Sequence, residues 1–328
     1  MTKITELKSD NIQKIRKCFY DGKIWTKNKL SKHTMLALAT TTNVLQYLLK
    51  RQEIQYMGEA KSTGGRKSKQ YCLNPDYLHL GLLNLKRDEQ YHYLIIKSCN
   101  LFGKTVFKQK ITSKTGELNE ILKALDCLCE NDLKIGCLSI SIPGVCKNGV
   151  INICDFDALV NKDIGGLLKE RYQMPIIIEN DVNVAGMGFS KHYDTSDNLA
   201  LLYQPKVKYI GCSLIINHQL CPGFSNFAGE LAYLPIYTHR QQQQLLKENP
   251  YLLLLKQLVS LCCVTNPEIV GISSDVIDDF KGEGIEEYLP IEHCPQIVYV
   301  KDFDGLIYEG LVFLGIELIL KKIKEGDE

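Results

Sequence analysis

The sequence predicts an α/β protein with two unlike parts, and three observations support this prediction. The 328 residues are 45% hydrophobic and 23% charged, which is the composition of a globular protein of about two domains. Residues 1–75 contain fifteen Lys and Arg against five Asp and Glu, whereas the remainder contains 24 against 33. After Asn74-Pro75 the pattern changes to alternating strands and helices. A small basic module therefore precedes a larger acidic α/β body, and disordered, collagen-like and coiled-coil proteins are excluded.

Three helical patterns open the chain. Ser9 or Asp10 can cap the first helix, and Thr26 can cap a short second helix. A third helix is predicted over Ala39–Lys50. The residues that helical spacing places toward the core are Ile12, Ile15, Cys18, Phe19, Leu30, Val44, Leu45, Leu48 and Leu49.

Two strand-like runs, Ile54–Met57 and Ser68–Leu73, flank a turn that contains Gly64-Gly65. Three helices followed by such a hairpin predict a winged helix-turn-helix, whose third helix enters the DNA major groove with its N-terminus first. Basic side chains of the hairpin can then contact phosphates or the minor groove. Ordinary helix capping by the threonines and a solvated hairpin remain alternatives. The expected DNA-binding residues are Thr40, Thr41, Thr42, Asn43, Lys61, Arg66, Lys67 and Lys69.

The body downstream of Pro75 is about 250 residues long, enough for two lobes of alternating strands and helices. Strands are predicted at Tyr91–Lys97, Ile135–Ser141, Ile176–Glu179, Leu199–Tyr203 and Ile210–Asn217. Helices are predicted at Leu118–Glu130, Ile164–Tyr172, Pro250–Val264 and Leu306–Lys322.

The thirteen cysteines have no spacing typical of zinc fingers or of a disulfide framework, so they predict reduced thiols in a reducing cytosol. The segment Met1–Glu6 carries an early acid and no apolar core, which is unlike a secretory signal. No apolar run is long enough to span a membrane, since the nearest to one, Gly310–Leu320, is short and contains Glu317. These features predict a soluble cytoplasmic protein with no membrane partner.

Several motifs resemble those of one known family. Glu179–Ala185 reads Glu-Asn-Asp-Val-Asn-Val-Ala, Ser141–Gly144 ends in a Pro-Gly turn, and Ala228–Tyr233 begins Ala-Gly-Glu. Asn266–Val270 reads Asn-Pro-Glu-Ile-Val, and the hairpin and linker of Gly64–Pro75 fit the same pattern. The chain resembles the ROK family (repressor, open reading frame, kinase), specifically its transcriptional-repressor branch. The Glu-Asn-Asp motif is the specific part of this resemblance, because isolated Pro-Gly turns are common.

The resemblance implies a two-lobed actin-like (ribonuclease H-like) sugar kinase fold behind the winged helix, with sugar bound between the lobes. The implied boundaries are 1–75 for the DNA-binding domain, 76–182 with about 306–328 for the first lobe, and 183–305 for the second. Asp181 stands at the family's catalytic-base position, where a carboxylate can accept a hydroxyl proton, and a helix-capping role is the alternative. The implied sugar-binding residues are Gly144, Asn180, Asp181, Glu230 and Tyr233.

Two departures from the family argue against phosphoryl transfer. Its kinases hold the ATP phosphates on two glycine-bearing turns, the first of which also supplies an aspartate for Mg²⁺. In the matching stretch Gly81–Lys86, Leu83 replaces that aspartate and Leu85 replaces a glycine, while Tyr209–Leu214 keeps a single glycine. We therefore expect no catalytic residues and no cofactor.

The family's structural zinc site is also missing from the sequence. Tyr233 replaces a histidine that contacts both sugar and zinc, and Tyr237–Gln244 occupies the place of the zinc-binding cysteines. We expect no bound metal, a surface position for His239, and a shortened loop at the glutamine run. The segment Asp155–Asp157 lies where the family reaches the sugar from the other lobe, and Phe156 can either stack on a sugar or be buried in a turn.

Together these features predict a DNA-binding transcriptional regulator, in particular a repressor of carbohydrate-use genes. Its body would sense a sugar or sugar phosphate between the lobes and would lack kinase activity. The predicted partners are double-stranded operator DNA, the carbohydrate effector, and further copies of the chain in a homodimer or homotetramer, since a two-fold dimer presents two recognition helices to a palindromic site. An active ATP-dependent sugar kinase, favoured by Asp181, is one alternative, and a body that serves only oligomerisation is another.

Overall fold

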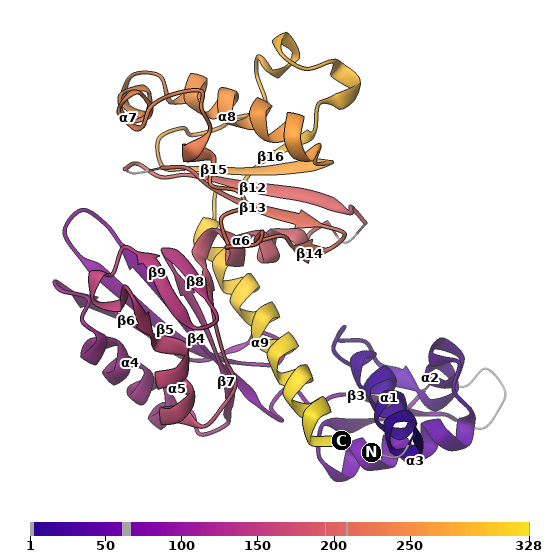
Figure 1. Cartoon of the computed structure of the whole chain (residues 1–328). Helices are drawn as coiled ribbons and strands as arrows, with labels where there is room; N and C mark the ends of the chain where they lie inside the picture. Colours follow the sequence, from indigo (N-terminus) through magenta and orange to yellow (C-terminus); the bar gives the residue numbers. More distant parts are fainter. Residues whose placement is uncertain (1–2, 61–66, 194, 208, 328) are drawn as a thin grey trace.

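The computed structural model describes residues 3–60, 67–193, 195–207 and 209–327 (Figure 1). A small N-terminal module with its own sheet is followed by two five-stranded sheets with their helices. The C-terminal helix α9 (Phe303–Asp327) runs from between the two large sheets to the N-terminal module. These two mixed sheets behind a helical module confirm the predicted fold class.

The described residues of the N-terminal module form three helices and a small antiparallel sheet. Its elements are α1 (Lys3–Lys17), β1 (Trp25–Thr26), α2 (Lys27–Thr34), α3 (Leu38–Lys50), β2 (Ile54–Glu59) and β3 (Lys69–Leu73). The sheet order is β1-β3-β2. The predicted inward face is buried, except that Cys18 and Leu49 are partly exposed. This helix order and hairpin form the winged helix-turn-helix expected from the sequence.

The first helix begins earlier than predicted. It starts at Lys3, so Ser9 and Asp10 lie inside α1 and neither caps it. Most of the helical residues before them, namely Lys3, Glu6, Leu7 and Lys8, are good helix formers and extend the helix, and Ser9 is buried. The second helix agrees with its prediction, because the Thr26 hydroxyl accepts a hydrogen bond of 3.3 Å from the first turn of α2 and Leu30 is buried.

The first large sheet carries helices and a small sheet on one face and α9 on the other. Its elements are β4 (His79–Arg87), β5 (His92–Asn100), β6 (Thr105–Ser113), α4 (Leu118–Asn131), β7 (Ile135–Ile142), β8 (Gly144–Lys147), β9 (Val150–Cys154), β10 (Lys162–Asp163), α5 (Ile164–Tyr172) and β11 (Ile176–Asn180). The strand order is β11-β7-β4-β5-β6, in which β11, β7 and β4 are parallel. α4, α5 and the β8–β10 sheet share one hydrophobic core, and α9 contributes to another.

The second large sheet has the same two-sided arrangement. Its elements are α6 (Asp181–Ser190), β12 (Asn198–Gln204), β13 (Gly211–Ile216), β14 (Gln219–Leu220), α7 (His239–Glu248), α8 (Pro250–Thr265), β15 (Ile269–Ser274) and β16 (Gln296–Tyr299). The strand order is β14-β13-β12-β15-β16. Helices α6 and α9 pack on one face, while α8, with α7 beside it, covers the other (Figure 1).

Helices α6 and α9 cross in close contact between the two sheets. A Cβ atom added to Gly310 of α9 would overlap the carbonyl of Val184 in α6, and one added to Gly188 of α6 would overlap the carbonyl of Leu306 in α9. Glycine at both positions therefore allows the two backbones to approach. This crossing fixes the N-terminus of α6, which begins at Asp181, between the lobes.

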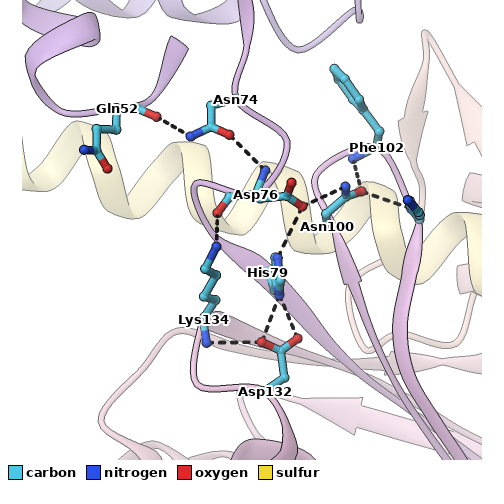
Figure 2. Close-up of polar contacts among 9 residues, drawn as sticks. Gln52, Asn74, Asp76, His79, Asn100, Phe102, Asp132 and Lys134 are labelled. Carbon is cyan, nitrogen blue, oxygen red and sulfur yellow. Dashed lines mark hydrogen bonds and ion pairs between the residues drawn. The ribbon is translucent and has the colours of Figure 1, made fainter. Parts of the chain in front are cut away.

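The linker between the N-terminal module and the first lobe is held at both ends by hydrogen bonds (Figure 2). The Asn74 side chain donates to the Gln52 carbonyl over 2.9 Å on the module side. On the body side, Asn100 donates to the Asp76 carboxylate over 3.1 Å, and Lys134 donates to the Asp76 carbonyl over 3.1 Å. The module is thus tied to the edge of the first lobe by side chains from β5 and the α4–β7 loop.

None of the helices in the described ranges is both long enough and apolar enough to cross a membrane. All thirteen cysteines lie in the described part of the chain and are free thiols. Several are buried in the hydrophobic clusters, where a thiol behaves as a small apolar side chain.

Candidate ligand cleft and DNA-binding surface

A cavity of about 780 Å³ is lined by residues of both lobes. The first lobe contributes the end of β4, the β4–β5 turn and the β8–β9 hairpin. The second lobe contributes the β12–β13 turn and the segment 227–233, and the start of α9 closes one side. All five residues expected to bind sugar line this cavity: Gly144, Asn180, Asp181, Glu230 and Tyr233.

The Glu-Asn-Asp motif forms the junction between β11 and α6. Asn180 caps α6, since its side-chain oxygen accepts a hydrogen bond of 3.0 Å from the Asn183 amide. Its amide nitrogen donates to the Gly144 carbonyl over 3.0 Å, and Glu179 accepts from the Asn183 side chain over 3.0 Å. A primary amide has two donor hydrogens and two acceptor positions, so Asn180 retains one of each for a ligand.

Asp181 is the first residue of α6 and lies partly buried in the cavity wall. Desolvation raises the pKa of its carboxyl to about 7; nearby Asp155 adds to this rise, whereas Lys86 opposes it. The helix cap is Asn180, so the capping role considered for Asp181 belongs to its neighbour. Asp181 therefore presents to the cavity a carboxyl group that is partly protonated near neutral pH.

The other three predicted sugar-binding residues surround this junction. Gly144 sits against β9 so closely that a Cβ atom would overlap the Ile153 carbonyl. Burial raises the pKa of the Glu230 carboxyl. Tyr233 is 57% exposed at the cavity mouth. The cavity thus combines an amide and two carboxyl groups on its floor with an aromatic ring at its entrance.

The stretch Gly81–Lys86 is not a turn, because it lies within the continuous strand β4. Leu83 and Leu85 are each only 1% exposed and pack in the core of the first lobe. The β4–β5 turn follows at Asp88, whose carboxylate accepts hydrogen bonds from two amides of its own turn at 2.8 and 2.7 Å. These bonds and one from the Tyr93 hydroxyl keep the pKa of Asp88 below its ordinary value. The turn therefore offers an anion where a phosphate would need free amides.

The glycine retained in the second lobe also has a structural explanation. A Cβ atom on Gly211, at the start of β13, would lie 2.6 Å from the Val182 side chain in α6. Glycine is therefore required there for packing of α6 against the sheet, whether or not a phosphate binds.

The glutamine run does not form the loop expected from the sequence. It lies inside α7, which begins at His239 after the N-cap Thr238, and Gln241 completes a capping box with Thr238. The Gln242 side chain is buried and donates to the Ala232 carbonyl over 2.7 Å. The capping box and the buried Gln242 side chain stabilise a helix here, so the predicted loop is wrong. Within the described ranges, no three His, Cys, Asp or Glu side chains are grouped so as to hold a metal ion.

The segment Asp155–Asp157 reaches the cavity through one residue. Asp155 lines the cavity, whereas Phe156 is fully buried and its ring lies 4.7 Å from the His92 ring. The buried-turn alternative is therefore correct for Phe156, and its ring is not available to a ligand.

Two aromatic residues that line the cavity near Tyr233 were missed from the sequence. Tyr209 and Phe227 line the cavity together with Tyr233, and the Phe227 and Tyr233 ring centres are 4.9 Å apart. His239 is exposed, as expected, and packs against both Tyr209 and Tyr233 at 4.7 and 5.2 Å. Nothing in the spacing of these residues could have grouped them, because they come from three separate segments of the second lobe.

The expected DNA-binding threonines occupy different environments on α3. Thr41 is fully buried and donates its hydroxyl to the Ala37 carbonyl over 3.1 Å, so the expectation that it contacts DNA is wrong. Thr40 and Thr42 are partly exposed and Asn43 is exposed. None of these residues caps the helix, whose N-cap is Ala37.

The exposed face of α3 continues one turn further than predicted. Gln46 is exposed, three residues after Asn43 and four after Thr42, so helical periodicity places all three on one side. Lys67 and Lys69 are exposed on the hairpin, whereas Lys61 and Arg66 lie outside the described residues. The module therefore combines a polar helix face with basic hairpin side chains.

The two mixed sheets, the cavity between them and the N-terminal module define an actin-like two-lobed protein that carries a winged helix. A family model described as "ROK family" matches residues 95–244. Over these residues the chain is similar to the ROK family.

Two curated relatives are repressors. The xylose repressor of Caldicellulosiruptor bescii is 27% identical over 246 residues, which cover 71% of this chain and 60% of that protein. The xylose repressor of Staphylococcus xylosus is 27% identical over 234 residues, covering 68% and 60%. The chain thus spans about 60% of the length of these relatives.

Solved structures of two kinds share the fold. A ROK family transcriptional regulator, described as a homolog of the E. coli MLC protein, matches with a TM-score of 0.70 at 16% identity, over 94% of this chain and 99% of that one. A ROK hexokinase from Thermus thermophilus matches with a TM-score of 0.56 at 16% identity, over 73% of this chain and 99% of that one. Because a regulator and a kinase both match, the fold alone does not separate the two activities.

Proposed function

We propose that this protein is a cytoplasmic DNA-binding transcriptional regulator, a repressor of carbohydrate-use genes, that senses a sugar or sugar phosphate between its lobes and has no kinase activity. The observation that carries this proposal is that one chain contains both a winged helix-turn-helix and a cavity between two lobes. A basic winged helix-turn-helix is tied by a hydrogen-bonded linker to a body with a polar-floored cavity. The curated relatives named as repressors support the same reading.

On the DNA side, the N-terminal half of α3 would enter the major groove. Thr40, Thr42 and Asn43 would face base edges, and Lys61, Arg66, Lys67 and Lys69 would contact phosphates or the minor groove. A homodimer or homotetramer would place two such helices on a palindromic operator. The DNA-binding domain would comprise residues 1–75.

On the ligand side, the first lobe would comprise 76–182 with about 306–328, and the second lobe 183–305. Gly144, Asn180, Asp181, Glu230 and Tyr233 would contact the sugar in the cavity between them. Ligand can change DNA affinity only if it binds the two lobe arrangements differently. Helix α9 reaches from the cavity, where Phe303 lines the wall, to α1 of the module, which supplies a physical link between the sites.

The deciding experiment measures DNA affinity of the full chain with and without carbohydrate. A preferred duplex is selected from random sequences, and its affinity is followed by fluorescence anisotropy at several salt concentrations. Xylose is the first effector to add, because of the names of the relatives, followed by other pentoses, hexoses and their phosphates. We expect a selected duplex to bind tighter than random DNA and one carbohydrate to change that affinity at least tenfold. Equal affinity for selected and random duplexes would refute DNA-sequence recognition.

A sugar kinase is the second candidate, and one observation favours it. A carboxyl group with a pKa of about 7, as at Asp181, can accept a proton from a sugar hydroxyl at neutral pH. The anionic β4–β5 turn at Asp88 opposes this reading, because it disfavours phosphate binding. A coupled assay with ATP–Mg²⁺ and the same sugars distinguishes the two. We expect no turnover, and turnover that is lost in Asp181→Asn would establish the kinase.

A further inference from the structure

We propose that the cavity takes a neutral glycoside of at least two rings, whose first sugar binds the polar floor and whose second sugar ring stacks on the aromatic group at the mouth. This inference rests on the proposed carbohydrate sensing and names the class of ligand. The aromatic group comprises Tyr209, Phe227 and Tyr233, all of which line the cavity.

The size of the cavity is the first argument. Its volume of about 780 Å³ falls in the range of sites that enclose drug-sized ligands, and it is several times larger than one sugar ring. The hydroxyl-reading groups, Asn180, Asp181 and Glu230, belong to the floor, where β11, α6 and the 227–233 segment meet. A single sugar held there leaves most of the cavity to solvent.

The chemistry of the mouth is the second argument. Tyr209, Phe227 and Tyr233 are 40%, 45% and 57% exposed, although they are large side chains gathered in one place. When exposed aromatic rings cluster in this way, the surface that they form is typically a binding site. Carbohydrate rings present an apolar C–H face that packs flat on an aromatic ring while their hydroxyls stay at the edge.

The rings are held in place before any ligand arrives. His239 packs against Tyr209 at 4.7 Å and against Tyr233 at 5.2 Å, and Phe227 packs against Tyr233 at 4.9 Å. α7 positions His239 through the Thr238 cap. A platform that is already ordered loses little conformational entropy when a ligand binds, which favours its use as a binding site.

The excess of acidic side chains in the cavity lining favours an uncharged second sugar ring over an anionic one. Among the described lining residues, six carboxyl-bearing side chains outnumber three basic ones. Two of the basic residues are engaged within the protein: Lys86 pairs with Asp304 at 2.6 Å, and Arg87 donates to the Asp155 carbonyl over 2.8 Å. A phosphate or carboxylate on the second ring would meet excess negative charge. An uncharged sugar meets no such penalty.

The test compares matched one-ring and two-ring sugars on the full chain by isothermal titration calorimetry. Xylose is paired with xylobiose and glucose with cellobiose, and the 4-nitrophenyl glycosides form a third set. We expect the second sugar ring to lower Kd about tenfold for the sugar that binds, which is the size of one good stacking contact. Phe227→Ala should remove this gain and leave the one-ring affinity within about twofold, and Tyr233→Ala should remove the gain as well.

Two variants control for folding and for general loss of aromatic surface. Phe224→Ala removes a ring of the same loop that is 94% exposed but does not line the cavity, so it should keep the full gain. Tyr233→Phe preserves the stacking surface and should also keep it. If Tyr233→Phe loses the gain together with Tyr233→Ala, stacking is not the cause and the inference is wrong.

The remaining outcomes separate this inference from the proposed function. If a one-ring sugar binds and the second ring adds nothing, the inference fails while carbohydrate sensing stands. If only the nitrophenyl arm gains affinity, the second ring is an aromatic aglycone and not a sugar. If none of the sugars binds, both the inference and the sensing proposal fail.

Discussion

Two carboxyl groups, Glu53 in the N-terminal module and Asp181 in the cleft, differ in the partners that surround them. Glu53 is 2% exposed in the module and forms short ion pairs with two arginines, Arg16 and Arg51, both at 2.6 Å. Asp181 lies in the cavity wall, and its described hydrogen bond is to the Val182 backbone amide at 2.9 Å. Lys86, the cation that lowers the pKa of Asp181, forms an ion pair with Asp304.

This difference separates a structural charge from a functional one. A buried carboxylate with guanidinium partners is compensated, and the Arg16–Glu53 pair joins α1 to the turn between α3 and β2. A carboxyl group without an ion-pair partner among the described residues has its pKa raised to about 7 by desolvation, which is costly to the fold. Groups of the second kind concentrate at ligand sites, because a ligand can supply the missing partner.

The largest effect is expected from breaking the paired carboxylate. Glu53→Gln leaves the buried Arg16 beside a neutral amide, and loss of one partner of a buried pair costs about 3–5 kcal/mol. The only tryptophan of the chain, Trp25, lies in this module, so its fluorescence during urea unfolding reports on the module. We expect the Trp25 transition to move to lower urea and DNA affinity to fall with it.

The matched control is an exposed pair in the same module. Lys23→Met removes the Lys23–Asp21 contact of 2.9 Å, in which the lysine is 70% exposed, and should cost no more than about 0.5 kcal/mol. If Glu53→Gln and Lys23→Met shifted the Trp25 transition equally, burial of the Glu53 pair would have no consequence and the comparison above would be wrong.

The cleft can be disturbed without touching the module. Gly144→Ala places a Cβ atom on the Ile153 carbonyl, so the β8–β9 hairpin must move, at a cost of about 1–3 kcal/mol. The shift also displaces the Gly144 carbonyl that anchors Asn180. We expect carbohydrate binding, measured by calorimetry, to be lost while the Trp25 transition stays in place. Unchanged binding would mean that the hairpin does not form part of the site.

Much of the fold was predictable because its signals are local. Thr26 caps a helix, Leu30 faces inward four residues later, and the helix over Ile164–Tyr172 was predicted with the bounds that it has. The Glu-Asn-Asp motif located the strand-to-helix junction at the cleft, since a strand end followed by a capped helix is encoded within a few residues.

The errors arose where local signals competed with tertiary contacts. The glutamine run looked like a loop, yet a capping box and the burial of Gln242 make it a helix. Thr41 looked like its neighbours, yet helical periodicity turns it into the core. Tyr209 and Phe227 were not predicted to join Tyr233 at the cavity, because only the folded second lobe brings their segments together.

The unpaired carboxyl gives a pH dependence of known sign. The pKa of Asp181 is about 7 in the folded chain, against an ordinary value of 3.8, so between these values the folded state holds a proton that the unfolded state releases. Stability from this group is full below about pH 4 and is lost as the pH rises toward 7. An asparagine at position 181 does not titrate, so the Asp181→Asn variant lacks this pH-dependent loss of stability. Between pH 5 and pH 8 we expect its free energy of unfolding to rise by about 2 kcal/mol relative to that of the parent.

Urea unfolding followed by circular dichroism at several pH values measures this gain. Asp88→Asn is the control, since hydrogen bonds hold the pKa of Asp88 below its ordinary value and it stays ionised throughout this range. Its difference from the parent should be constant with pH. A constant difference for Asp181→Asn as well would mean that Asp181 is solvated like a surface acid, and the contrast with Glu53 would lose its basis.

The smallest effect is expected at Lys69, whose side chain is exposed, in contrast to the buried Glu53. Lys69 is exposed on β3, so Lys69→Ala should weaken DNA binding by a similar factor for every duplex and reduce the salt dependence by about one unit of slope. Asn43→Ala, on the exposed face of α3, should instead cost about 1–3 kcal/mol on the selected duplex and little on random DNA. Anisotropy titrations of both duplexes at several salt concentrations separate the two. A sequence-dependent loss at Lys69 would make the hairpin a reader of bases, because a pure phosphate contact cannot distinguish one sequence from another.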